Sequence, residues 1–466
     1  MSKGNKRKHD IDKNADNKRV KFDISVQKSL AKPGINELPN EMLLNIFSYL
    51  DQKDILTATL VMKKWNKLIS NTEKIMQKIQ KIYIDTANMI SGVPKFTRPY
   101  AKIDVVGVKL ECDLSLLNRL RKIGDGIDTI LFDHCWFLGN AMTSFLKCFK
   151  NVENLNITHC EITEVPVQHK VILRELSLLH LDISTWPLLY IEAPRLNKLQ
   201  CHSMLVEDPK ILINFLNQQT TLEILDLNCF YNLFHSSAVQ LNPRFKLKKL
   251  TLIDLVNYDK DQMLNLLSTM TESLTTLDVG IDMGNYVTKY VLENFINLES
   301  LVIDCDSLPK TPYFYTDIKT SQTLKKVEIN GELDKTISVL HFLENHPEIE
   351  ILDMSLLFNI PSTRYSFWNR LAGVTQKVSC LTIDVLDSDN IHYIKSKNLK
   401  FFDTHSLEVI DIANWIEFCR NNPNIERFHV CATDDSFNIN DVKVVLTQNL
   451  PKLREFSVDY SPTITT

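Results

Sequence analysis

The sequence lacks the patterns of a membrane protein, a disulfide-rich secreted protein and a zinc-finger protein. No stretch reaches the roughly 18 consecutive apolar residues that a membrane-spanning helix needs, and the polar, basic beginning of the chain does not resemble a signal peptide. The 10 cysteines are scattered and include no C-x-x-C pair, so their spacing fits neither a disulfide framework nor a zinc site. We therefore expect a soluble protein of the nucleus, the cytoplasm or both, without a membrane contact.

The sequence also lacks the short motifs of common enzymes. It contains no G-x-G-x-x-G, no P-loop, no H-E-x-x-H and no G-x-S-x-G. The 12 histidines are dispersed, and none is paired with Cys or a carboxylate at metal-ligand spacing. We accordingly expect no catalytic residues, no cofactor and no metal site; an enzyme would need a catalytic cluster that the sequence does not display.

Residues 1–34 form a basic arm. Residues 1–21 contain eight Lys and Arg against three Asp, a net charge of +5, which leaves −9 on the rest of the chain. Because the arm has few large apolar residues, we expect it to be disordered. A solvated basic tail is one interpretation, and the acidic remainder argues against nucleic acid as the main partner. The other is a bipartite nuclear import signal, bound by an importin, formed by Lys6, Arg7, Lys18, Arg19 and Lys21.

Residues 35–80 predict a small module of closely spaced helices. Leu38-Pro39 marks the start of the first helix, since proline is tolerated at the first helical position. Asp51 is a candidate cap of a second helix, and a third carries Trp65. So short a module cannot hide all of its apolar residues internally, so we expect part of this surface to contact a partner.

The order of residues in this module resembles an F-box. The match runs from Leu38-Pro39-x-Glu41-x-Leu43-Leu44-x-Ile46-Phe47-x-Tyr49-Leu50 through Asp54-Ile55-Leu56 and Val61 to Trp65-Asn66-x-Leu68. Met62 and Lys64 depart from the usual Cys and Arg. The resemblance implies that some of these positions pack within the module and the rest contact a Skp-type adaptor. The positions concerned are Leu38, Pro39, Leu43, Leu44, Ile46, Phe47, Leu50, Ile55, Leu56, Val61 and Trp65.

The rest of the chain repeats one apolar pattern. The unit apolar-x-x-apolar-x-apolar recurs about every 25 residues, which is within the period of leucine-rich repeats. Helix-like stretches lie between the units, as a right-handed β/α solenoid requires. About fourteen irregular units begin at Ile127, Val152, Leu173, Leu196, Leu222, Leu247, Leu274, Leu298, Leu324, Ile349, Val378, Leu399, Ile425 and Leu453.

The predicted fold class is therefore α/β. A small all-α module at residues 35–80 precedes a curved leucine-rich-repeat solenoid at residues 127–466, with parallel strands on its concave face. Residues 81–126 form a linker or cap, in which Ile103-x-Val105 is a candidate degenerate repeat.

Polar residues on the predicted strands form a candidate surface for a target protein. They point away from the core because strand side chains alternate. One interpretation is a negative stripe that selects a basic segment of the target, and the other is the ordinary polarity of an exposed sheet. The acidic residues concerned are Asp226, Asp278, Asp304, Glu328, Asp353, Asp384 and Asp403.

Taken together, the module and the repeats resemble the family of F-box proteins with C-terminal leucine-rich repeats. These are substrate-recognition subunits of SCF-type ubiquitin ligases, and the resemblance implies that role for this chain. The F-box would bind the Skp adaptor and through it a cullin, the repeats would bind a protein substrate, and catalysis would belong to other subunits. Two alternatives remain: an adaptor-bound scaffold that degrades nothing, and a nuclear interaction protein, which only the basic arm favours.

Overall fold

The computed structural model describes residues 35–72, 75–76, 81–85, 100–163, 170–182, 185–202, 209–228, 241–255, 258–280, 283, 285–304, 307–308, 323–332, 336–354, 357–358, 365–384, 391–405, 412–432 and 439–460. The chain divides into two compact units, Met1–Ile79 (unit 1) and Gln80–Thr466 (unit 2). The predicted nuclear import signal and the whole basic arm lie outside the described residues. Among the helices that are described, none is long and apolar enough to cross a membrane.

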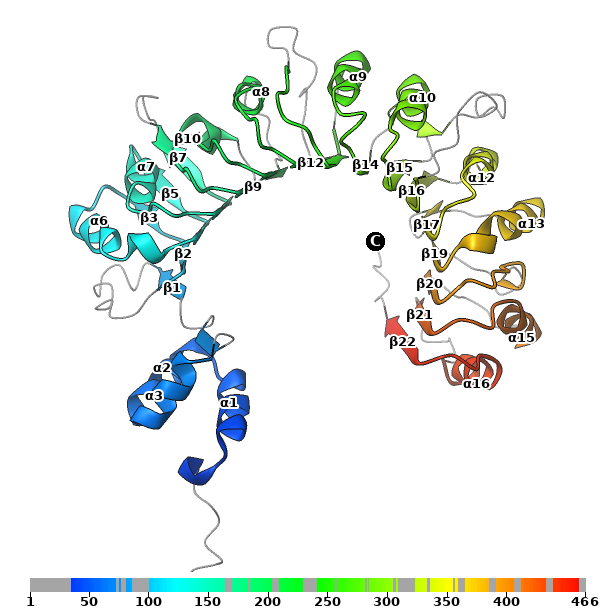
Figure 1. Ribbon diagram of the computed structural model, residues 1–466, viewed down its shortest axis with the longest axis horizontal. Coiled ribbons are helices and arrows are strands. Elements are labelled where there is room, and N and C mark those ends of the chain that lie inside the picture. Colours follow the sequence, from blue (N-terminus) through cyan, green and yellow to red (C-terminus); the bar gives the residue numbers. More distant parts are fainter. Residues whose placement is uncertain are drawn as a thin grey trace, which may run out of the picture. The chain divides into compact units, whose positions relative to one another are not determined.

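The described part of unit 1 is helical (Figure 1). Its elements are η2 (Ile35–Glu37), α1 (Asn40–Tyr49), α2 (Gln52–Val61) and α3 (Lys63–Ser70). Pro39 is the N-cap of α1, one position before the predicted one, and brings no side-chain cap. Asp51 caps α2 as predicted, because its carboxylate accepts a hydrogen bond of 2.8 Å from the amide of Asp54.

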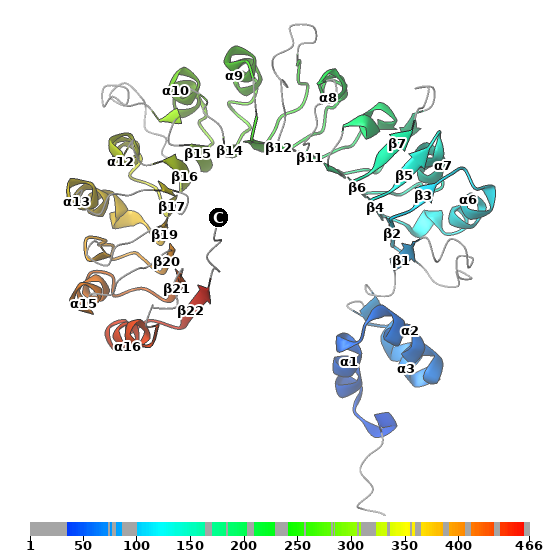
Figure 2. The same cartoon turned by 180° about the vertical axis from the view of Figure 1, so that it is seen from behind.

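The strands of unit 2 pair side by side in one long parallel sheet (Figures 1 and 2). Their order in the sheet follows the sequence, so each strand between the two ends pairs with the strands of the repeats before and after its own. The strands are β1 (Lys81–Ile84), β2 (Lys102–Val106), β4 (Thr129–Asp133), β6 (Asn154–Thr158), β9 (Leu178–Asp182), β11 (Lys198–His202), β12 (Ile224–Asn228), β13 (Lys249–Ile253), β14 (Thr276–Gly280), β15 (Ser300–Asp304), β16 (Lys326–Glu332), β17 (Ile351–Met354), β19 (Cys380–Asp384), β20 (Phe401–His405), β21 (Arg427–Ala432) and β22 (Glu455–Tyr460).

Helices connect many of these strands and cover one face of the sheet (Figure 1). They are α6 (Leu114–Arg121), α7 (Ala141–Leu146), α8 (Lys210–Leu216), α9 (Lys260–Ser268), α10 (Asn285–Asn294), α12 (Thr336–Asn345), α13 (Tyr365–Val374), α15 (Ile412–Asn421) and α16 (Ile439–Asn449), with 3₁₀ turns η3 (Gly124–Gly126), η4 (Trp186–Leu189) and η7 (Thr375–Lys377). Short outer strands make two small parallel sheets, β3 (Lys109–Leu110) with β5 (Trp136–Leu138) and β7 (Glu161–Thr163), and β8 (Val171–Ile172) with β10 (Ile191–Glu192). The strand β18 (Leu357–Phe358) pairs with the end of β16.

The core of unit 2 lies between the sheet and its helices. Along a typical strand such as β12, Leu225 and Leu227 are buried and the residues between and beside them are half-buried. Parallel pairing then stacks each anchor on the corresponding anchor of the next repeat, as with Leu225 and Leu250. This stacking of buried anchors fixes the register between neighbouring strands. A parallel sheet built from such repeats is consistent with a solenoid.

The sequence pattern predicts the wrong register for one of the repeat units. The unit starting at Leu173 predicts Leu176 and Leu178 as the strand anchors, whereas β9 buries Leu179 and Leu181. Leu178 begins the strand and pairs with Asn154. The segment is rich in leucine, so the pattern fits at two positions three residues apart, and stacking on the neighbouring strands selects the later one.

The parallel sheet begins within residues 81–126. Strand β1 pairs with β2, and β2 pairs with β4, so Ile103 and Val105 stack on Ile130 and Phe132. Both are fully buried. The helix α6, capped by the carboxylate of Asp113, follows these first strands. The segment therefore contributes to the core of unit 2.

Candidate functional site

Unit 1 has a small apolar core of its own. Leu43 and Phe47 of α1 pack with Ile55 of α2 and Trp65 of α3. The rings of Phe47 and Trp65 meet edge to face, with centroids 5.3 Å apart, a favourable aromatic geometry. Replacing any of these residues would test the folding of the unit and not its contact with a partner.

The residues predicted to contact an adaptor fall into three groups. Those in the core are Leu43, Phe47, Ile55 and Trp65; those half-buried against it are Leu38, Leu44, Leu50 and Leu56; those exposed are Pro39, Ile46 and Val61. Only the exposed and half-buried groups offer surface to a partner.

A second apolar face of α1 is exposed. Met42, Ile46 and Tyr49 follow each other at helical spacing, on a different side from Leu43 and Phe47, and Tyr49 is 82% exposed. At the end of α2, Leu60 is 83% exposed and Val61 follows it. We call these five residues the exposed apolar set of unit 1. The sequence argument did not assign Met42, Tyr49 and Leu60 to a contact, although the helical spacing of the first two was a signal for it.

The second candidate surface is the face of the sheet that the helices leave uncovered, here called the strand face. The third residue of each strand lies on it and is in register with the third residues of the neighbouring strands, which together form a central row. From β9 to β22 this central row reads His180, Gln200, Asp226, Thr251, Asp278, Val302, Glu328, Asp353, Thr382, Asp403, His429 and Ser457. The structure thus brings the predicted residues Asp226, Asp278, Glu328, Asp353 and Asp403 into one row.

Asp278 is electrostatically disfavoured within this row. Partial burial raises the pKa of its carboxyl group, and the nearby carboxylates of Glu328 and Asp226 raise it further. The ammonium groups of Lys249 and Lys326 oppose this effect. A positive group placed close to Asp278 would relieve this repulsion.

Cations also lie on the strand face beside the central row, with neutral residues between them. The first residues of the strands are in register too, and they include Lys198, Lys249, Lys326 and Arg427. They share the strand face because alternate residues point to the same side. The ion pair of Lys81 on β1 with Asp104 on β2 shows that such a cation reaches the central row of the next strand.

The remaining predicted acidic residues lie on the strand face in other settings. Asp304 ends β15 opposite Asn330, and Asp384 ends β19 opposite His405, so both are outside the central row. Asp403 is half-buried, and its carboxylate lies 2.7 Å from Nδ1 of His429. The other ring nitrogen of His429 lies 3.3 Å from Asp459. This part of the row is already satisfied by contacts within the protein.

Two clefts open away from the strand face. One of about 450 Å³ is lined by Arg244 and Gln262 among other residues. The other, of about 470 Å³, is lined by Glu344, Arg370 and Lys377. In the second cleft the guanidinium of Arg370 donates to both carboxylate oxygens of Glu344, at 2.8 and 2.7 Å. The charged groups of this second cleft make ion pairs within the protein. The residues that line the two clefts include no pairing of a nucleophile with a base.

Comparison with known proteins agrees with the helical architecture of unit 1. A family model described as F-box-like matches residues 35–79. No curated protein matches the chain. Among solved structures, the chain is similar to one described as "Crystal structure of Rad7 and Elc1 complex in yeast", with 14% identity over 89% of this chain and 92% of that one and a TM-score of 0.32. The chain therefore combines an F-box-like domain with a long parallel β/α sheet.

Proposed function

We propose that this chain is the substrate-recognition subunit of an SCF-type ubiquitin ligase. The observation that carries the proposal is the exposed apolar set of an F-box-like domain, with Tyr49 and Leu60 more than four-fifths exposed. Large apolar side chains that are exposed together on one small domain are typical of a protein interface. The partner we propose for it is a Skp-type adaptor, which in turn binds a cullin.

The core of unit 1 supports this proposal because it holds the interface in place. Phe47 and Leu43 fix α1 on the other two helices, so the side chains on its second, exposed apolar face are presented on a rigid support. A preorganised apolar surface binds more tightly because little side-chain and backbone entropy is lost on association.

We propose that unit 2 binds the target protein through the strand face and that its repeats form a curved solenoid with this face on the concave side. The acidic residues of the central row and the cations beside it favour a target segment that carries both signs, with its basic groups over Asp278, Glu328 and Asp353. Electrostatic complementarity of this kind sets specificity and register more than raw affinity. The chain itself supplies proximity between target and conjugating enzyme, and no catalytic group.

Charge reversal tests the target surface. Replacing Asp278, Glu328 and Asp353 by Lys is expected to reduce target capture, measured by co-purification. A matched control replaces three exposed acidic residues of the helices, Asp261, Glu293 and Glu417, by Lys and changes the net charge equally. Equal capture by the two variants would refute the assignment of the target to the strand face.

Assembly in cells tests the proposed function as a whole. Purification of the tagged chain after proteasome inhibition should recover a Skp-type adaptor, a cullin and ubiquitinated target proteins. Depletion of the chain should then lengthen the half-life of those targets. Adaptor recovery with unchanged half-lives would instead favour the scaffold that degrades nothing, and absence of the adaptor would refute both.

A further inference from the structure

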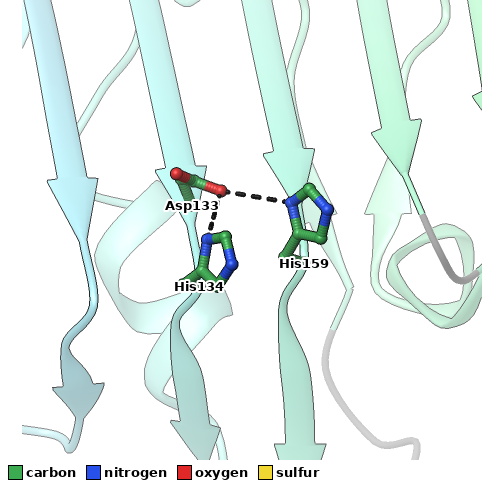
Figure 3. Close-up of side chains that lie close together, drawn as sticks. All are labelled: Asp133, His134 and His159. Atoms are coloured by element: carbon green, nitrogen blue, oxygen red, sulfur yellow. Dashed lines mark hydrogen bonds and ion pairs between the residues drawn. The ribbon is translucent and has the colours of Figure 1, made fainter. Parts of the chain in front are cut away.

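Two histidines and an aspartate from successive repeats meet at the edge of the strand face (Figure 3). Asp133 is the last residue of β4, and His134 follows it, while His159 follows the neighbouring strand β6. The Nδ1 atoms of His134 and His159 lie 2.8 and 3.4 Å from the same oxygen of Asp133. The potential metal-ligand atoms, one from each residue, lie within 4.8 Å of one another.

We propose that Asp133, His134 and His159 form a binding site for a divalent transition metal of the Zn²⁺ class. In a tetrahedral zinc site the ligands lie about 2.0–2.2 Å from the ion, so neighbouring ligand atoms are roughly 3.3 Å apart. The two measured separations from the Asp133 oxygen bracket that value. Two imidazoles and one carboxylate favour zinc and similar metals over the all-oxygen ligands of calcium or magnesium.

The surroundings of His159 and Asp133 support the assignment. A metal-binding histidine usually directs its second nitrogen to a carboxylate, which fixes the ring and raises its basicity. The Nε2 atom of His159 lies 3.8 Å from the carboxylate of Asp182 on β9. The hydroxyl of Thr158 donates to the Asp133 oxygen at 2.9 Å, which orients that carboxylate. The carboxylate of Asp133 is thus held by a hydrogen bond, and the second nitrogen of His159 faces a carboxylate that a small movement of the ring would bring within hydrogen-bond distance.

The side chains have the freedom that coordination requires. The two rings are stacked with centroids 4.5 Å apart and planes only 15° from parallel. An ion must lie in the plane of each ring, so binding requires the rings to tilt toward each other. Their side chains are 60% and 44% exposed, which leaves room for that tilt. Three protein ligands leave a fourth position for water.

The backbone at the two histidines provides a clean way to remove them. His134 and His159 both have positive φ, 52° and 53°, and Gly107 has φ 64° at the corresponding position after β2. Glycine adopts this conformation without the steric cost that a side chain meets. Substitution of both histidines by Gly therefore removes two ligands while favouring the observed turn.

Zinc titration of the full-length protein tests the site. Accessible thiols, including that of the exposed Cys112, are first alkylated, and bound Zn²⁺ is measured by competition with a chromophoric chelator. We expect one tight site per chain, absent from His134→Gly/His159→Gly and weakened at least about tenfold in Asp133→Asn. Asp254→Gly is the matched control, because Asp254 has φ 52° after β13 and lies outside the cluster; it should bind Zn²⁺ as the wild type does.

Two further readouts separate loss of metal from loss of fold. Co²⁺ bound to the wild type should give the intense visible absorption of a tetrahedral site, and the double Gly variant should not. Without metal, the melting temperature of that variant should equal or exceed that of the wild type, and adaptor binding should be unchanged. The proposal is overturned if the alkylated wild type binds no Zn²⁺, or if the double Gly variant binds it equally well.

Discussion

Leu60 is the residue whose substitution most sharply tests the adaptor surface. Leu60 is the penultimate residue of α2 and is 83% exposed. Leu60→Ala removes three carbon atoms, each contributing about 0.8 kcal/mol when buried. If an adaptor covers the exposed fraction, the loss of binding free energy is up to about 2 kcal/mol, which is roughly a thirtyfold increase in Kd. Because alanine is the best helix former, the helix itself should not suffer.

The assay is isothermal titration of the purified full-length variant with a Skp-type adaptor. Leu114→Ala is the matched control, since Leu114 is also a leucine on a helix and 70% exposed, but belongs to unit 2. We expect a weaker complex for Leu60→Ala and wild-type affinity for the control. Wild-type affinity for Leu60→Ala, or equal weakening in both variants, would refute the placement of the adaptor on unit 1.

Two further predictions concern stability. Phe47→Ala should destabilise unit 1 by about 3–5 kcal/mol, so limited proteolysis should cleave within residues 40–70 while unit 2 stays intact; the exposed Tyr49→Ala should remain resistant, and equal cleavage of both variants would contradict the core assignment. Asp278→Asn should raise the unfolding temperature at pH 7. Burial and the nearby Glu328 raise the pKa of Asp278 above its ordinary 3.8, so above pH 3.8 its ionisation favours the unfolded chain. The gain should vanish below that pH, and an equal gain at pH 3 would contradict the electrostatic explanation.

The helices of unit 1 could be predicted from the sequence, but the sides they expose could not. Apolar residues surround α1, with Met42 and Ile46 on one side and Leu43 and Phe47 on another. Periodicity alone does not say which of two apolar faces meets the other helices. The sequence argument therefore grouped the fully buried Leu43 with Val61, which is exposed.

The buried residues of the strands could be predicted from the apolar period wherever the pattern fitted the sequence at one position only. Leu250 and Leu252, for example, are both fully buried on β13. The period failed at Leu173, where a run of leucines allows two registers and only stacking on β6 and β11 decides between them. The cations beside the central row were missed because the argument followed the acidic positions alone.

The histidine cluster shows a limit of reading motifs along a chain. His134 and His159 are separated by one repeat, far outside the spacing of a helical or hairpin metal motif, and appear unrelated in sequence. Parallel stacking of β4 and β6 brings them together. In a repeat protein, residues one period apart are neighbours, so the period itself should define the spacing searched for ligands.

Reconstitution from purified proteins tests the central claim most directly. The full-length chain, a Skp-type adaptor and a cullin are mixed and their complexes measured by sedimentation velocity. We predict that chain and adaptor form a one-to-one complex, and that the cullin joins it only when the adaptor is present. A chain that sediments alone with the adaptor in excess, or that binds the cullin without it, would contradict the account.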